Sequence, residues 1–189
     1  FILTNPPFGL SIDARDYDFS TLKTCKDVNG YMLKKQTSEI VFIERSFQEL
    51  KPGGTLAIVI PRSSAPNSSL STARKALGEY GYIFGVMDLP PETFASTGTQ
   101  TTTLVIFARK YKQIGESKES TSVAIAKIRN VGFDATGRQR EGSELPYFAK
   151  YMSISLQSRM EHKFVSLIEL PSKAKSFELL EDFFVTRNT

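Results

Sequence analysis

The chain has 189 residues, of which 40% are hydrophobic and 11% aromatic, enough for one sizeable domain or for one domain with a small appendage. Its net charge of +4 is compatible with a nucleic-acid partner but indicates one only mildly. The single cysteine, Cys25, and the single histidine, His162, exclude a disulfide framework and argue against a Cys/His zinc site, and no stretch approaches the roughly 20 apolar residues of a membrane span.

The chain opens on an apolar run, Phe1 to Thr4, which predicts a strand that is already under way at the first residue. The run ends at Asn5, Pro6, Pro7 and Phe8. Each proline fixes its own φ and lacks an N–H, so neither a strand nor a helix continues through it, and the residue before a proline is pushed out of the helical region. The sequence therefore predicts a stiff loop at the carboxyl end of a strand, which is where open α/β sheets bind ligands.

The side chains of this loop suggest one kind of ligand. The carboxamide of Asn5 and the backbone carbonyl of Pro6 are hydrogen-bond acceptors, and Phe8 is a flat ring that can stack on another. Two acceptors and a stacking surface fit a planar ring with an exocyclic amino group, such as adenine. The alternative is a strand followed by a Pro-Pro turn, in which Asn5 forms the turn and Phe8 belongs to the core.

Residues 11–35 are polar and charged and predict a long loop, with at most one helical turn, that is mobile without a ligand. Thr37 or Ser38 can cap a helix with Glu39 in its first turn. One face of that helix is apolar and carries Ile40, Ile43, Phe47 and Leu50. The other face is predicted to be solvated and carries Glu44, Arg45, Gln48 and Glu49. The run 55–60 lacks alternation, which predicts a strand covered on both faces and ended by Pro61.

The next stretch continues the alternation of helices and strands. A polar loop from Arg62 precedes a predicted helix over 70–80 with Gly81 as its C-cap, and strands are predicted over 82–89 and 101–108. Between those strands lies a loop of small residues that includes Thr97, Gly98 and Thr99. The order predicts a doubly wound α/β sheet whose last two strands are antiparallel neighbours.

The polar stretch over 109–120 suggests a domain boundary. Residues 1–112 are predicted to form the domain that carries the candidate catalytic residues, and residues 113–189 a C-terminal appendage. The appendage is predicted to contain a strand over 123–131, a turn over 132–138, a helix over 151–164 and a weakly amphipathic end with Phe177, Leu180 and Phe184.

Several segments together resemble one family, the N6-adenine DNA methyltransferases, and within it the methylation subunit of type I restriction-modification systems and its single-chain relatives. The resemblance rests on Asn5-Pro6-Pro7-Phe8, on 50–61, on 89–94 with the Thr97-Gly98-Thr99 loop, and on 130–138 with Glu144-Leu145-Pro146. It implies the carboxyl-terminal half of a Rossmann-like class I methyltransferase sheet with the last strand antiparallel. The family's glycine-rich cofactor motif is absent and would precede Phe1, so we expect the chain to be part of a longer protein and to be inactive alone.

The resemblance implies transfer of a methyl group from S-adenosylmethionine to adenine N6 in DNA by the parent protein. Asn5, Pro6 and Phe8 would be catalytic, Asn5 would also touch the cofactor, and Pro7, Arg62, Thr97, Gly98 and Thr99 would contact the substrate. The implied partners are double-stranded DNA and a specificity subunit or fused recognition domain, with no metal and no membrane, in the cytoplasm of a bacterium or archaeon.

Two other functions remain open from the sequence. The Asn-Pro-Pro-aromatic pattern also resembles methyltransferases that act on protein glutamine or RNA guanine, because these acceptors share the planar amino group. Residues 113–189 could instead form a non-catalytic assembly module that docks a specificity subunit.

Overall fold

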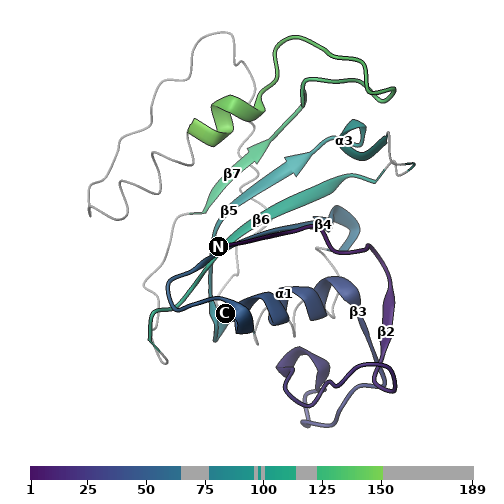
Figure 1. Cartoon of the computed structure of the whole chain (residues 1–189), viewed down its shortest axis with the longest axis vertical. Coiled ribbons are helices and arrows are strands. Elements are labelled where there is room, and N and C mark those ends of the chain that lie inside the picture. The colour runs from purple at the N-terminus through teal and green to yellow at the C-terminus, as the bar shows by residue number, and fades with distance from the viewer. Residues whose placement is uncertain (65–76, 96–97, 99–100, 114–122, 151–189) are drawn as a thin grey trace, which may run out of the picture. The chain divides into compact units, whose positions relative to one another are not determined.

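The computed structural model describes residues 1–64, 77–95, 98, 101–113 and 123–150 (Figure 1). The chain divides into two compact units, Phe1–Val86 with Thr103–Val123, and Met87–Thr102 with Ala124–Thr189. The predicted helix over 151–164 and the amphipathic end lie outside the described residues, as does most of the predicted helix over 70–80.

A five-stranded sheet organises the chain, in the order β1-β4-β6-β5-β7. Its strands are β1 (Ile2–Thr4), β4 (Thr55–Pro61), β5 (Gly81–Leu89), β6 (Thr103–Lys110) and β7 (Ala124–Lys127). β1 is parallel to β4, with Thr4 opposite Ile58, and β4 is antiparallel to β6, with Pro61 opposite Thr103. The predicted strands over 1–4, 55–60, 82–89 and 101–108 are thereby confirmed within one or two residues at each end.

The first residues of β5 lie against the last residues of β6, so these two strands run in opposite directions as predicted. The N–H of Tyr111 donates to the carbonyl of Tyr80 at 2.9 Å, and the rings of Phe84 and Phe107 lie 6.2 Å apart. Gly81 was predicted to be a helix C-cap, and this is wrong: it is the first residue of β5. A Cβ atom on Gly81 would lie 2.1 Å from the carbonyl oxygen of Arg109, so glycine is required here by close backbone approach.

Helix α1 (Ser38–Glu49) confirms the predicted amphipathic segment, and its apolar side chains Ile40, Ile43 and Phe47 are buried. Its C-terminus is satisfied from β6, because Lys110 Nζ donates to the carbonyls of Leu50 at 2.7 Å and Gln48 at 3.2 Å. A cation at the negative end of the helix dipole is a favourable arrangement.

One residue of α1 contradicts the prediction. Glu44 was expected on the solvated face, but it is fully buried. Its carboxylate accepts hydrogen bonds from the N–H groups of Lys23 and Thr24, from the Thr24 hydroxyl and from the Tyr80 hydroxyl, at 2.5–2.9 Å. A buried carboxylate is tolerated when its oxygens are hydrogen-bonded in this way. Glu44 therefore ties α1 to the segment that precedes it.

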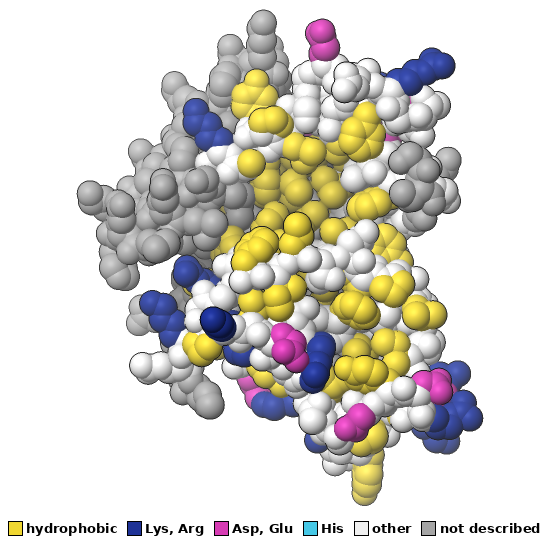
Figure 2. Space-filling view, in the orientation of Figure 1, with side chains coloured by type: hydrophobic (Ala, Val, Ile, Leu, Met, Phe, Trp, Pro, Cys, Tyr) yellow, Lys and Arg dark blue, Asp and Glu magenta, His cyan; other side chains and the backbone are white. Residues whose placement is uncertain are grey.

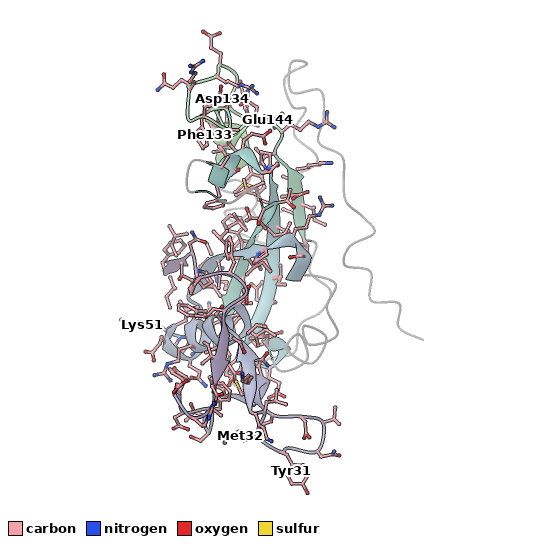
Figure 3. The ribbon with its side chains drawn as sticks, turned by 90° about the vertical axis from the view of Figure 1, so that its right-hand side faces the viewer. Tyr31, Met32, Lys51, Phe133, Asp134 and Glu144 are labelled. Atoms are coloured by element: carbon pink, nitrogen blue, oxygen red, sulfur yellow. The ribbon has the colours of Figure 1, made fainter. Side chains whose placement is uncertain are left out.

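Residues 11–37 are an ordered segment, not the long loop that was predicted. Strands β2 (Ser11–Asp13) and β3 (Lys35–Thr37) form an antiparallel ribbon, and a short 3₁₀ helix, η1 (Lys23–Cys25), lies between them. A small core holds the segment against α1; it consists of Phe19, Leu22, Cys25 and Val41, with Ile12 and Ala14 packed on it. Burial raises the pKa of the Cys25 thiol to about 11. Figure 3 shows Tyr31 and Met32 at the far end of this segment, and both are exposed.

The second unit contains a short helix, α3 (Glu92–Ala95), strand β7 and a long turn over 129–144. β7 is shorter than the predicted strand over 123–131, because from Arg129 on the chain bonds to Glu144 and its neighbours. The Glu144 carboxylate accepts from the N–H of Arg129 at 2.6 Å, and Asn130 Nδ2 donates to the Glu141 carbonyl at 2.8 Å. The predicted turn is present, with Phe133 paired to Gln139 and the Asp134 carboxylate capping it (Figure 3).

Candidate functional site

The candidate site is the loop Asn5–Gly9, which begins one residue after β1. Asn5 and Pro7 are exposed, Phe8 is half-buried and Pro6 is buried. Gly9 has a φ of +65°, in the left-handed region that glycine adopts without strain, and this turn leads the chain into β2. The sequence predicted both the end of the strand and the stiff loop after it.

The loop is fastened to the first two residues of α1. Ser38 Oγ donates to the carbonyl of Pro7 at 2.6 Å, and the N–H of Gly9 donates to Glu39 Oε1 at 2.6 Å. The N–H of Ser38 donates to the carbonyl of Leu10 at 2.8 Å. Ser38 is fully buried and Glu39 is 3% exposed, whereas Pro7 and Gly9 are exposed, so both side-chain bonds are partly buried. Their effect is to fix the backbone on one side of the loop.

The two acceptors predicted from the sequence, the Asn5 carboxamide oxygen and the Pro6 carbonyl, take no part in the hydrogen bonds to Ser38 and Glu39. Within the part of the chain that the structure describes, no hydrogen bond is made to the Asn5 carboxamide or to the Pro6 carbonyl, whereas the neighbouring Pro7 carbonyl is taken by Ser38. The loop can therefore offer two acceptors from consecutive residues, beside a half-buried aromatic ring.

Arg62 follows β4 directly, in the short 3₁₀ helix η2 (Arg62–Ser64). Because β1 and β4 are parallel neighbours, Asn5 and Arg62 follow the carboxyl ends of adjacent strands and lie at the same edge of the sheet. The first residue of β6, Thr103, reaches this edge as well, since it pairs with Pro61.

Of the three residues 97–99, which were also predicted to contact the substrate, the structure describes Gly98. Thr97 and Thr99 lie outside the described residues, and Gly98, in the second unit, has a φ of +82° and donates its N–H to the Ala95 carbonyl at 3.0 Å. Two cations at the end of β6 have structural partners. Arg109 Nε donates to the Gly53 carbonyl at 3.0 Å, and Lys110 caps α1.

Sequence reasoning missed Ser38 and Glu39 as parts of the site, because it interpreted them as helix caps. The N-cap of α1 is Thr37, whose side chain makes no capping hydrogen bond, and the side chains of Ser38 and Glu39 bind the loop 30 residues earlier in the chain. A serine and a glutamate in the first turn of a helix fit ordinary capping equally well, so no local signal separates the two roles.

Among the residues that the structure describes, no group of three or more His, Cys, Asp or Glu side chains is arranged to hold a metal ion. None of the helices in the described ranges has the length and apolar character needed to cross a bilayer.

The chain is similar to several known proteins. Solved structures with the same fold include a protein from Listeria monocytogenes assigned to the class I S-adenosylmethionine-dependent methyltransferases, with a TM-score of 0.56 and 20% identity over 78% of this chain and 40% of that one. They also include the type I restriction-modification methyltransferase subunit of Streptococcus thermophilus, with a TM-score of 0.54 and 21% identity over 87% of this chain and 32% of that one.

Among curated proteins, the defence against restriction protein B of Escherichia phage P1 is 27% identical over 110 residues, which are 58% of this chain and 4% of that protein. The chain thus spans well under half the length of each of these three proteins. The likeness to the solved structures confirms the predicted Rossmann-like α/β fold. The family profile described as N-6 DNA Methylase matches residues 1–142, so the chain belongs to the N-6 DNA methylase family.

Proposed function

We propose that the protein containing this chain transfers a methyl group from S-adenosylmethionine to N6 of adenine in DNA, as the modification component of a restriction-modification system in a bacterial or archaeal cytoplasm. The observation that carries the proposal is the Asn5–Gly9 loop. It holds two acceptors to which none of the described residues donates, Asn5 Oδ1 and the Pro6 carbonyl, beside Phe8 at the carboxyl end of a parallel strand. Family membership supports the same chemistry.

The acceptors fit the difficulty of the reaction. The lone pair of an aromatic amino nitrogen is delocalised into the ring, so the nitrogen is a weak nucleophile. If Asn5 and Pro6 accept its two N–H groups, the positive charge that builds on the nitrogen during transfer is stabilised by dipoles that are already in place. Once the methyl group has been transferred and the sulfur has left as a neutral thioether, the nitrogen would release one of its two protons to water, so no general base with a shifted pKa is required.

The acceptor amino group is buried in a DNA duplex, so the base must leave the helix at a cost of a few kcal/mol. Stacking on Phe8 would return roughly 1–3 kcal/mol of that cost. Pro7, Gly98 and the neighbouring Thr97 and Thr99 would shape the base pocket, and Arg62, at the same sheet edge as Asn5, would contact a phosphate. A separate specificity subunit or a fused recognition domain would select the DNA sequence.

S-adenosylmethionine would supply an electrophilic methyl group on a sulfonium. The Asn5 carboxamide is polar and uncharged and could lie beside such a methyl group. We therefore propose that Asn5 lies between the cofactor and the acceptor amino group. The remaining cofactor contacts are proposed to come from parts of the protein other than residues 1–189.

The test is Asn5→Ala in the full-length protein, with methyl incorporation into an adenine-containing duplex and cofactor affinity measured separately. Removing one preorganised hydrogen bond typically lowers kcat by about 10²–10³-fold, and we expect a loss of this order. The matched control is Asn29→Ala, because Asn29 is an exposed asparagine remote in sequence from the loop. Unimpaired transfer by Asn5→Ala would show that Asn5 does not have its proposed role. Methylation of a protein or RNA acceptor in place of DNA would show that the proposed substrate class is wrong.

A further inference from the structure

The side chains of Ser38 and Glu39 have a role that helix capping does not explain. Both are buried, both lie at the start of α1, and both bind atoms of the loop Asn5–Gly9 rather than the free N–H groups of their own helix. A buried polar side chain is expected to be committed to a partner. Here the partners are backbone atoms on either side of Phe8.

The loop needs an external fastening because of its own sequence. Pro6 and Pro7 have no N–H, so the backbone cannot be held there by donors to neighbouring carbonyls. The attachment points that remain are carbonyls and the N–H groups of the flanking residues. The Ser38 hydroxyl donates to the Pro7 carbonyl at 2.6 Å, and the Gly9 N–H donates to the Glu39 carboxylate at 2.6 Å. The Ser38 N–H donates to the Leu10 carbonyl at 2.8 Å.

The choice of carbonyl matters for chemistry. Among residues 5–8, the hydroxyl of Ser38 engages Pro7 and leaves the preceding carbonyl, that of Pro6, without a hydrogen bond among the described residues. Since adjacent carbonyls of an extended chain face in different directions, holding the Pro7 carbonyl toward α1 keeps the Pro6 carbonyl from turning there.

We propose that Ser38 and Glu39 are positioning residues for methyl transfer: together they hold the Asn5–Gly9 loop so that Asn5 Oδ1 and the Pro6 carbonyl face the acceptor amino group. The inference rests on the proposed function and adds to it the residues that set the geometry of the acceptors. Misplacement of a reacting group by about 1 Å can cost about 10²-fold in rate, which sets the scale of the effect.

Another glutamate on the same helix provides a matched control. Glu44 is also buried, and its carboxylate also accepts backbone N–H groups, but these belong to Lys23 and Thr24 and not to the loop. Replacing Glu44 therefore removes the same kind of interaction from the same helix while leaving the loop attachments in place.

The experiment measures kcat, the KM for DNA, the cofactor affinity and the melting temperature of the full-length protein and its variants. For Glu39→Ala and Ser38→Ala we expect kcat to fall, by up to about 10²-fold for the glutamate, and cofactor affinity to change much less, since Asn5 is the one loop residue proposed to touch the cofactor. Glu39→Gln keeps an acceptor oxygen for the Gly9 N–H and is expected to recover most of the rate. Glu44→Gln is expected to lower the melting temperature at least as much as Glu39→Ala while kcat at a temperature well below melting stays at the wild-type value.

The outcomes separate this inference from the proposed function. If Asn5→Ala abolishes transfer but Glu39→Ala and Ser38→Ala retain the full kcat, the positioning role is wrong and the proposed function stands. If Glu39→Ala and Glu44→Gln lower kcat equally, the role of Glu39 is only structural. If Asn5→Ala is fully active, the proposed function itself is wrong.

Discussion

The backbone of the loop Asn5–Gly9 is constrained at nearly every residue by a different cause. Pro6 and Pro7 fix their own φ angles and restrict the residues before them. Gly9 occupies the left-handed region, where an L side chain would be strained by about 1–2 kcal/mol. Ser38 and Glu39 then fix the carbonyl and the N–H that lie between those residues. A loop with so few free torsions can present acceptors without paying to order them when a substrate arrives.

Cys25 yields a prediction about pH at the scale of one residue. Burial raises the pKa of its thiol from 9.0 to about 11, so the folded state holds the proton more tightly than the unfolded chain does. The resulting stabilisation is complete below pH 9 and is lost as the pH rises toward about 11. We expect the free energy of unfolding in urea to fall between pH 9 and pH 11 more steeply for the wild type than for Cys25→Ser.

The comparison with Cys25→Ser isolates the thiol, because Tyr80 contributes in the same direction. Burial, together with its hydrogen bond to Glu44, raises the pKa of Tyr80 above its ordinary value in both proteins. Equal pH slopes for the wild type and the variant would contradict the prediction. Rapid alkylation of Cys25 in the native protein at pH 8 would do so as well, since a buried neutral thiol reacts slowly.

At the scale of helices and strands, the contact between Gly81 and β6 yields a stability prediction. A Cβ at position 81 would lie 2.1 Å from the Arg109 carbonyl oxygen and 2.8 Å from the ring of Phe47. Gly81→Ala must therefore push β5 away from β6, and overpacking of this kind typically costs about 1–3 kcal/mol or more. The measurement is the free energy of unfolding by chemical denaturation.

The control is Gly78→Ala, since Leu77 and Gly78 are the described residues before β5 that are helical. A Cβ there meets no atom within 4 Å, and alanine is favoured over glycine in a helix by up to about 1 kcal/mol. We expect Gly78→Ala to be neutral or stabilising. A similar loss of stability in both variants would show that the backbone contact at Gly81 is not the cause.

The helices and strands of the first unit were predictable because their signals are local. The apolar spacing of α1 and the unbroken apolar run of β4 each lie within a dozen residues, and each was recognised. Glu44 was wrongly predicted on the solvated face because it is a charged residue. Its position, four residues after Ile40 and three before Phe47, puts it on the buried face of α1. The small core of residues 11–37 was missed in the same way, since Phe19, Leu22 and Cys25 are scattered among charges.

The candidate site shows the same limit. Asn5, Pro6 and Phe8 could be selected from the sequence, since their chemistry and the end of the strand are adjacent along the chain. The pairing of Ser38 and Glu39 with that loop could not, because it spans about 30 residues and depends on how β2 and β3 return the chain to the start of α1.

For the whole molecule, strand order is the property that the sequence determines least. Alternation of helices and strands predicted an α/β sheet with an antiparallel final pair; the five-stranded sheet and the antiparallel neighbours β5 and β6 are present, and the doubly wound arrangement stays a prediction. Insertion of β6 between β4 and β5 was not predicted, because pairing between distant strands leaves no periodic trace in either one. The predicted boundary after residue 112 stays a prediction. The two compact units divide within β5 and after Thr102, and β7 adjoins β5 in the sheet.

The terminal place of β1 in the sheet has a consequence for handling the 189-residue polypeptide in solution. Among the described strands β1 pairs with β4 alone. Phe1, which precedes β1, is 81% exposed, and Leu3, within it, is 70% exposed; hydrophobic side chains are visible on the face that Figure 2 presents. An uncovered strand edge with apolar side chains invites pairing with a second chain. We expect this polypeptide to self-associate as its concentration rises in sedimentation velocity runs, and Leu3→Lys to shift it toward the monomer. A sample that remains monomeric at high concentration would show that the edge is harmless.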